Sequence, residues 1–179
     1  MRADEWSYSV SCLSMTRRAS LLWATVIAVA VFFFDQGLKS LVEGSMRVGQ
    51  SISLVPGLLD LTYIKNDGGA FGILGGSRLI LLAGSAVAVI VVLWMLFSGR
   101  PTRLATVGCG LILGGAAGNL LDRLGSGEVT DYVHFSFWYI FNAADAAIVV
   151  GVGLLLLSAL RPEPVSRRPA IEEKQRMGG

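Results

Sequence analysis

The sequence predicts an all-α polytopic membrane protein, and three observations support this fold class. The chain of 179 residues is 53% hydrophobic and only 16% charged, whereas soluble domains carry about 25% charged residues. Four long apolar runs follow one another, and a helix needs about 20 residues to cross a bilayer. Open sheets cannot satisfy their backbone groups in lipid. Soluble globular, disordered, fibrous and nucleic-acid-binding classes therefore fit poorly.

The four apolar runs predict four membrane-spanning helices within one domain. The expected spans are residues 19–41, 79–98, 102–123 and 138–160, inside a domain of residues 19–161. The first helix should continue past its apolar run, because Asp35 and Lys39 lie four residues apart and can pair on one helix face. That run ends without a small-residue cleavage pattern, so a cleaved signal peptide is not expected. Residues 1–18 and 162–179 are predicted to be cytoplasmic tails, the second one disordered.

The segment between the first two spans is too polar to cross a membrane and is predicted to lie outside it. Alternating apolar residues on both sides of Pro56-Gly57 predict a short β-hairpin over residues 51–64. Residues 66–69 form a sharp turn in this interpretation. Residues 70–74 are apolar and are expected to lie in the membrane interface.

The distribution of positive charge predicts the orientation in the membrane. With the amino terminus inside, ten of the 15 Lys and Arg residues fall on the cytoplasmic side, several of them directly beside a span. Excess positive charge marks the cytoplasmic side. Both termini are therefore predicted to be cytoplasmic, which places the two longer polar connections outside.

The third span carries glycines at every fourth position, Gly110, Gly114 and Gly118. This spacing leaves one strip of the helix without side chains and predicts close packing against a neighbouring helix. Gly108-Cys109-Gly110 begins like a dinucleotide-binding loop, but no strand precedes it, so packing is the favoured interpretation.

Polar side chains gather at the outer ends of the predicted spans. Asn119 and Asp122 end the third span, and Asn142 and Asp145 begin the fourth, each pair spaced to share a helix face. Asp131 lies in the short outer loop between them. Ionisable residues inside a membrane are costly and usually functional, so this end of the molecule is the candidate site.

The residue types at this end favour carboxylate chemistry. The chain has one histidine, His134, and two cysteines, which leaves no Cys- or His-based metal site. A Ser-His-Asp arrangement would need this single histidine, and no serine lies in a nucleophile-elbow context. Two neighbouring carboxyl groups share a proton and can act as general acid and base in peptide hydrolysis. Asp145 is the first candidate, and these arguments leave either Asp122 or Asp131 as its partner. A structural ion pair is favoured for Asp122 because Arg123 follows it.

Four motifs occur in an order that resembles a known family. They are Asn66–Gly72, Gly118–Arg123, Val129–Tyr132 and Phe141–Asp145. Together with Asp35 and Lys39, they resemble the bacterial lipoprotein signal peptidases, also called type II signal peptidases, over roughly residues 20–160. The resemblance implies four membrane helices with a small outer β-cradle and an interfacial loop helix.

The resemblance also implies an activity in the bacterial cytoplasmic membrane. The family members are aspartyl endopeptidases that remove signal peptides from diacylglyceryl-modified prolipoproteins, cutting on the amino side of the lipidated cysteine. No cofactor or metal is implied. The expected partners are lipid-modified prolipoproteins and membrane lipids, and the expected state is a monomer with its site toward the outer leaflet.

Carried over residue by residue, Asp131 and Asp145 match the catalytic pair. Substrate-binding or supporting roles are expected for Asn66, Gly68, Asn119, Asp122, Arg123, Asn142, Asp35, Lys39 and Phe71. Phe71 is expected to close over the site. Gly69 and Tyr132 depart from the commonest family residues, as does the polar amino-terminal extension, and Gly69 affects only the stiffness of its loop.

Three other interpretations remain open at this point. A small proton-coupled transporter subunit would use Asp131 and Asp145 as a relay, although relays are expected near the midplane and open to both sides. A structural scaffold would leave the polar clusters without a reason. A different intramembrane aspartyl protease class carries a Gly-x-Gly-Asp motif, which this sequence lacks.

Overall fold

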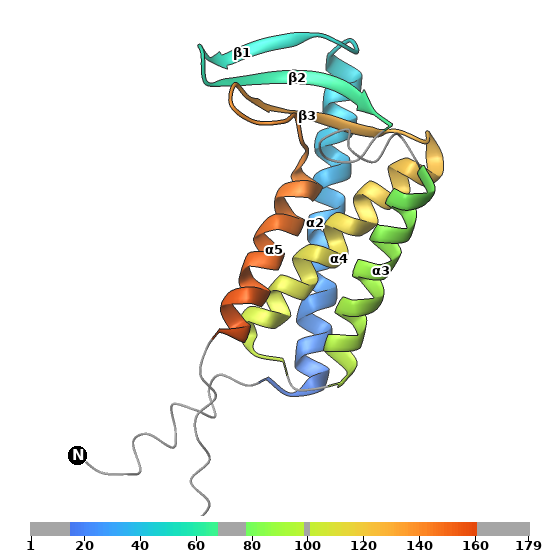
Figure 1. The fold of residues 1–179 in the computed structure, drawn as a ribbon, viewed down its shortest axis with the longest axis vertical. Coiled ribbons are helices and arrows are strands. Elements are labelled where there is room, and N and C mark those ends of the chain that lie inside the picture. The colour runs from blue at the N-terminus through green and yellow to red at the C-terminus, as the bar shows by residue number, and fades with distance from the viewer. Residues whose placement is uncertain (1–14, 68–77, 99–100, 161–179) are drawn as a thin grey trace, which may run out of the picture.

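A computed structural model describes residues 15–67, 78–98 and 101–160, and within them four helices form a bundle with a small sheet across one end (Figure 1). The elements in chain order are α2 (Arg17–Ser45), β1 (Ser51–Val55), β2 (Leu59–Asn66), α3 (Arg78–Ser98), α4 (Arg103–Gly125), β3 (Val129–Phe135) and α5 (Ala143–Ala159). The predicted interfacial segment at residues 70–74, Gly68, Phe71 and most of both tails lie outside the described residues.

Local capping explains where α2 begins. The Thr16 hydroxyl accepts a hydrogen bond from the Ala19 amide, so the helix begins at Arg17, two residues before the predicted span. It continues past the apolar run to Ser45, and the expected pair of Lys39 and Asp35 is formed at 2.6 Å.

The start of α5 corrects a prediction. The span was expected from residue 138, but the helix begins at Ala143, because Asn142 forms a capping box with Asp145. Phe141, which precedes this cap, instead pairs with Val133 of β3. Asp145 therefore lies in the first turn of its helix rather than two turns inside it.

The helices present apolar surfaces outward. Two of the described helices, α2 and α4, are long and apolar enough to cross a membrane, and α3 and α5 contain shorter apolar helical stretches. Large side chains such as Phe33, Trp94 and Val149 are between 68% and 71% exposed. Exposed apolar surface on this scale is typical of contact with lipid or another apolar partner.

The sheet is antiparallel in the order β1-β2-β3. The predicted hairpin is present as β1 and β2, which turn at Gly57 with φ 75°. The segment that carries Asp131 was expected as a loop and is instead the strand β3, which pairs with β2. A cluster of Val42, Met46, Tyr63 and Tyr132 packs this sheet on the end of α2.

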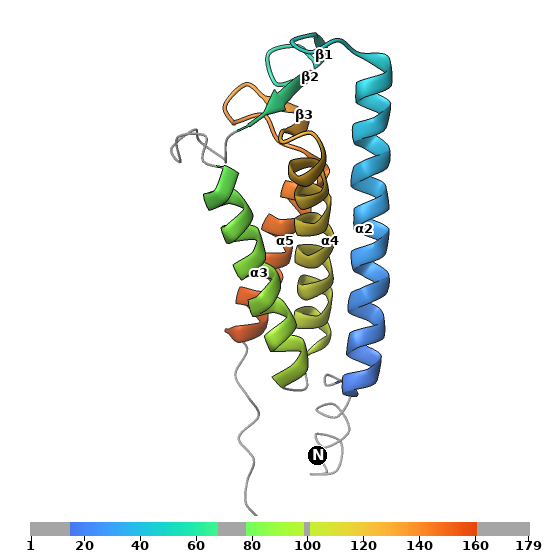
Figure 2. The same ribbon diagram turned by 90° about the vertical axis from the view of Figure 1, so that its right-hand side faces the viewer.

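Helix α4 lies in the middle of the bundle and packs on all three other helices (Figure 2). The predicted glycine strip faces α2: a Cβ atom at Gly114 would lie 2.5 Å from the Ala28 carbonyl oxygen. A second strip, which the glycine spacing did not predict, faces α5. There a Cβ at Gly115 would lie 2.5 Å from the Ala144 oxygen, and one at Gly108 would lie 2.7 Å from the Gly151 oxygen.

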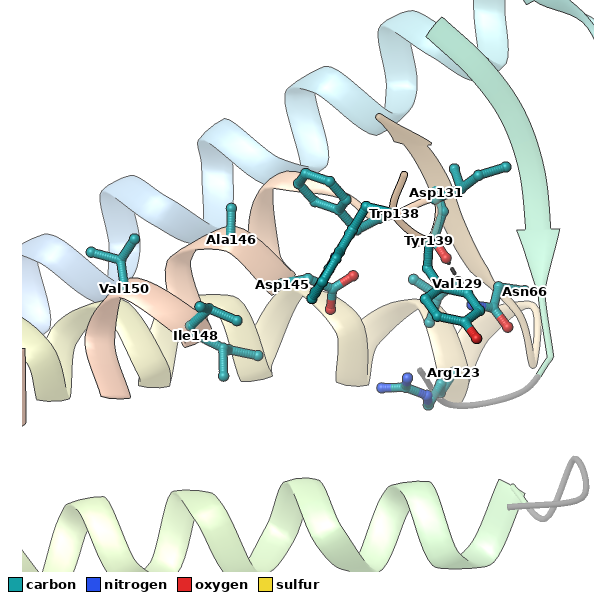
Figure 3. Close-up of a pocket in the computed structure, with 13 residues that line it drawn as sticks. Asn66, Arg123, Val129, Asp131, Trp138, Tyr139, Asp145, Ala146, Ile148 and Val150 are labelled. Carbon is teal, nitrogen blue, oxygen red and sulfur yellow. Dashed lines mark hydrogen bonds between the residues drawn. The ribbon is translucent and has the colours of Figure 1, made fainter. Parts of the chain in front are cut away.

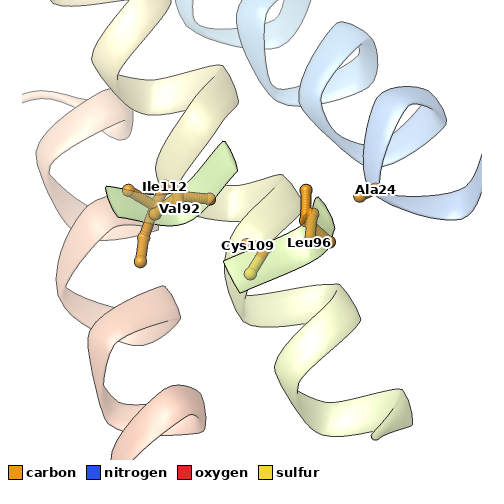
Figure 4. Close-up of a cluster of buried hydrophobic side chains, with 5 residues drawn as sticks. All are labelled: Ala24, Val92, Leu96, Cys109 and Ile112. Atoms are coloured by element: carbon orange, nitrogen blue, oxygen red, sulfur yellow. The ribbon is translucent and has the colours of Figure 1, made fainter. Parts of the chain in front are cut away.

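A core of small and branched side chains fills the bundle toward the end away from the sheet (Figure 4). Cys109 of α4 is fully buried there beside Ala24 of α2 and Val92 and Leu96 of α3. The close helix contacts and this core hold α4 against the other helices.

The second glycine strip yields a stability prediction. Gly115→Ala should lower the stability by about 1–3 kcal/mol, because the new methyl group meets backbone of α5 that cannot move aside alone. Gly153→Ala is the matched control, since a Cβ there meets nothing within 4 Å. Thermal unfolding in detergent micelles measures both. Equal midpoints for the two variants would show that α4 and α5 do not require this contact.

Candidate active site

A cavity of about 540 Å³ lies at the sheet end of the bundle (Figure 3). Asp131 from β3 and Asp145 from the first turn of α5 both line it, together with Asn66 at the end of β2 and Arg123 in the last turn of α4. The rest of the wall is mostly apolar and aromatic, and apart from Val129 it comes from the segment between Trp138 and Val150.

Both carboxyl oxygens of Asp131 accept hydrogen bonds. Asn66 Nδ2 donates to Oδ2 at 2.8 Å, and Asn142 Nδ2 donates to Oδ1 at 2.7 Å. The side chain is 2% exposed. Two amide donors from different elements thus fix the carboxyl group at the cavity wall.

Asp145 is held in a similar way. Asn119 Nδ2 donates to Oδ1 at 2.7 Å, and the Asn142 backbone amide donates to Oδ2 at 3.3 Å. Asn142 Nδ2 also donates to Asn119 Oδ1 at 3.1 Å. A continuous chain of hydrogen bonds therefore runs from Asp131 through Asn142 and Asn119 to Asp145.

A buried ion network lies behind this chain. Lys39 Nζ is 2.6 Å from both Asp35 Oδ2 and Asp122 Oδ2, and it donates to Asn119 Oδ1 at 3.0 Å. Asp35 Oδ1 accepts a hydrogen bond from the Ala144 amide in the first turn of α5. The network thus joins α2, α4 and α5 next to the hydrogen-bond chain that connects the two cavity aspartates.

The sequence left either Asp122 or Asp131 as the partner of Asp145, and the structure places these two candidates differently. Asp131 and Asp145 share the cavity, whereas Asp122 is not among the residues that line it and pairs with Lys39. Arg123 lines the cavity itself. The other predicted residues that the structure describes lie in the hydrogen-bond chain or in the ion network.

The electrostatic setting makes Asp131 harder to ionise than an exposed aspartate. Burial raises the pKa of Asp131 to about 6; hydrogen bonds from Asn66 and Asn142 act against this shift, and the nearby Asp145 charge adds to it. Two carboxyl groups in such a setting can hold one proton between them and act together as acid and base.

The aromatic part of the wall is not predicted by the sequence patterns. Trp138, Tyr139 and Phe141 belonged to the apolar run assigned to the fourth span, but they precede α5 and line the cavity. The Tyr132 hydroxyl was also missed, and it accepts a hydrogen bond from the Ala143 amide at the start of α5. The sequence signal was the Asn142-x-x-Asp145 cap, which marks the helix start.

Comparison with known proteins gives a consistent set of similarities. The family model described as signal peptidase (SPase) II matches residues 27–161. The chain is 39% identical over 140 residues to a lipoprotein signal peptidase of Halothermothrix orenii, covering 78% of this chain and 97% of the relative. It is 40% identical over 150 residues to that of Desulfitobacterium hafniense, covering 83% and 98%. A solved structure of a bacterial membrane enzyme superposes with a TM-score of 0.72 and 28% identity, covering 86% of this chain and 98% of that one.

The raised pKa of Asp131 predicts a pH dependence of stability. Because this pKa is about 6 in the folded protein and near 3.8 in the unfolded chain, the stability associated with Asp131 is present below pH 4 and is lost as the pH rises through 6. The loss amounts to about 3 kcal/mol at most. Asp131→Asn should therefore gain stability relative to the unmodified protein between pH 4 and pH 7. Thermal unfolding in detergent across this range measures the difference, and a pH-independent difference would contradict the prediction.

The ion network predicts a strong effect of removing its cation. Lys39→Met leaves the buried carboxylate of Asp35 and the partly buried one of Asp122 without their cation, which should cost about 3–5 kcal/mol. In a chain of this length the unfolding midpoint should fall by roughly 10 °C. Arg47→Met removes the same charge at an exposed position and serves as control. Similar midpoints for the two variants would mean that the network does not hold the bundle together.

Proposed function

The chain belongs to the signal peptidase II family, and from this premise we propose that it is an aspartyl endopeptidase of the bacterial cytoplasmic membrane. Its proposed substrates are diacylglyceryl-modified prolipoproteins, cut on the amino side of the lipidated cysteine. The observation that carries the proposal is the placement of Asp131 and Asp145 in one cavity, joined through Asn142 and Asn119.

In the proposed reaction, the two carboxyl groups share one proton. The ionised carboxylate takes a proton from a water molecule as the water attacks the scissile carbonyl carbon, and the protonated carboxyl donates to the carbonyl oxygen. The tetrahedral intermediate then breaks the C–N bond, and a proton passes to the leaving amine. Asn119 and Asn142 donate to the carboxyl oxygens and keep both groups oriented through these steps.

The apolar wall of the cavity supports a lipid-modified substrate. Part of the wall, at Val149 of α5, is 71% exposed, so the cavity adjoins an outward-facing apolar surface. In the proposed complex the diacylglyceryl chains stay in the bilayer beside this surface while the peptide bond reaches the carboxyl groups. Acyl burial is worth about 0.8 kcal/mol per methylene, so the bilayer also concentrates the substrate.

We place the protein as a monomer with four membrane helices, residues 19–161, between cytoplasmic tails, and with the cavity toward the outer leaflet. The positive charges beside the spans support this orientation. Gly68 and Phe71 are proposed to complete the substrate site, with Phe71 closing over it. No observation favours the proton-coupled transporter: the carboxylates around the cavity gather at one end of the bundle, whereas a relay needs access from both sides.

A cleavage assay tests the proposal directly. Purified protein should cut a diacylglyceryl-modified prolipoprotein peptide before the modified cysteine. Asp131→Asn or Asp145→Asn should reduce kcat by on the order of 10³-fold or more, because either change removes one member of the acid–base pair. Asp60→Asn is the matched control, since Asp60 lies in β2 outside the set of residues that line the cavity.

The same assay separates the competing functions. Intact peptide after incubation with the unmodified protein would overturn the peptidase proposal. Full cleavage by either cavity variant would overturn the two-aspartate mechanism while leaving a peptidase in place.

A further inference from the structure

Three ionic side chains follow one stripe of α2. Asp35, Lys39 and Glu43 are spaced by four residues, which places them one above another on the same helix face. Asp35 and Lys39 belong to the ion network beside the cavity: Asp35 accepts from the Ala144 amide, and Lys39 donates to Asn119. Both contacts lead to Asp145, since Ala144 precedes it and Asn119 donates to it.

Glu43, the member of the stripe nearest the carboxyl-terminal end of α2, makes a different connection. Lys65 Nζ of β2 lies 2.6 Å from Glu43 Oε1 and donates to Thr130 Oγ1 at 2.8 Å, and the Thr130 hydroxyl of β3 donates to the same Glu43 oxygen. These three side chains form a closed triangle, called the Glu43 cluster below.

The Glu43 cluster lies directly beside the cavity residues in sequence. Lys65 and Thr130 are paired across β2 and β3, and they precede Asn66 and Asp131. Neighbouring residues of a strand point to opposite faces of a sheet. The cluster therefore fastens to α2 the strand pair whose other face presents Asn66 and Asp131 to the cavity.

We propose that the Glu43 cluster is a positioning device that sets the separation between Asp131 and Asp145. One helix, α2, then holds both carboxyl groups, Asp145 through Asp35 and Lys39, and Asp131 through Glu43. This inference rests on the proposed function, in which the two groups share a proton and a water molecule. Such a pair needs close control of distance, because a displacement of about 1 Å can cost 10²-fold in rate.

The energetics distinguish this role from simple stabilisation. The side chains of Lys65 and Glu43 are 25% and 43% exposed, and ion pairs at this exposure contribute little to folding. Burial lowers the pKa of Lys65, but hydrogen bonding and the charge of Glu43 outweigh this effect, so the net shift is upward and the pair stays charged. An ion pair with little effect on stability can still have a large effect on geometry at the neighbouring residues.

The test compares kcat, KM and the unfolding midpoint in the cleavage assay with the lipidated peptide. Glu43→Gln and Lys65→Met should each lower kcat about 10-fold, with KM within about twofold and the midpoint within about 2 °C. Thr130→Val should lower kcat by a similar factor, but its midpoint should fall further, because it removes a hydrogen-bonded hydroxyl from a residue that is 1% exposed. Thr130→Ser keeps the hydroxyl and should restore most of kcat. The Glu43→Gln, Lys65→Met double variant should be no slower than the slower single variant, because the two act as one unit. Glu128→Gln, an exposed acid in the turn before β3, is the charge-matched control.

Each outcome decides the question. The pattern above supports the positioning role. Unchanged kcat in all three single variants overturns it and leaves the proposed function standing. A raised KM at constant kcat overturns it in favour of substrate binding, and loss of activity that follows a fall in the midpoint and is not rescued by Thr130→Ser overturns it in favour of a structural role. If the unmodified protein does not cleave the peptide, the proposed function itself fails.

Discussion

The hydrogen bonds of Asn142 are the interaction on which the site depends. Its Nδ2 group donates to Asp131 and to Asn119, its Oδ1 accepts from the Asp145 amide, and its backbone amide donates to the Asp145 carboxylate. A buried amide with all its side-chain hydrogens and its oxygen engaged has no second arrangement of similar energy. The same residue therefore begins α5, orients one carboxyl group directly and orients the other through Asn119.

This arrangement requires α4 to approach α2 and α5 closely, and the glycines of α4 permit it. A Cβ at Gly118 would lie 2.5 Å from Asp35 Oδ2, so the bare position makes room for the carboxylate that accepts from the Ala144 amide. Gly115 allows the Ala144 carbonyl to approach in the same region. Small residues at helix contacts are usually explained by packing alone. Here they also allow a polar network to pass between three helices without displacing them.

The sequence predicted the parts of this structure that local patterns determine. Apolar runs located the helices, Pro56-Gly57 located the hairpin, and the spacing of Asp35 and Lys39 predicted their pair. It did not predict β3, because the partner strand of Asp131 lies about 65 positions away in the chain. It also placed Asp145 too deep, because aromatic residues before the cap are as hydrophobic as those within a span. The pairing of Asp122 with Lys39 depends on how α2 and α4 pack, which no local pattern contains.

The charges of the ion network bear on the proposal that Asp131 and Asp145 hold a single proton between them. Lys39 lies 2.6 Å from two carboxylates, Asp35 and Asp122, and these two negative charges offset its positive charge. Asn119 and Asn142 then contribute dipoles rather than charges to Asp131 and Asp145. Amide donors orient a carboxyl group. They favour its ionised form less strongly than a direct ion pair does. In the proposed mechanism, the pair held by amides exchanges a proton during each turnover. This role separates the two cavity aspartates from Asp35 and Asp122, which bind Lys39.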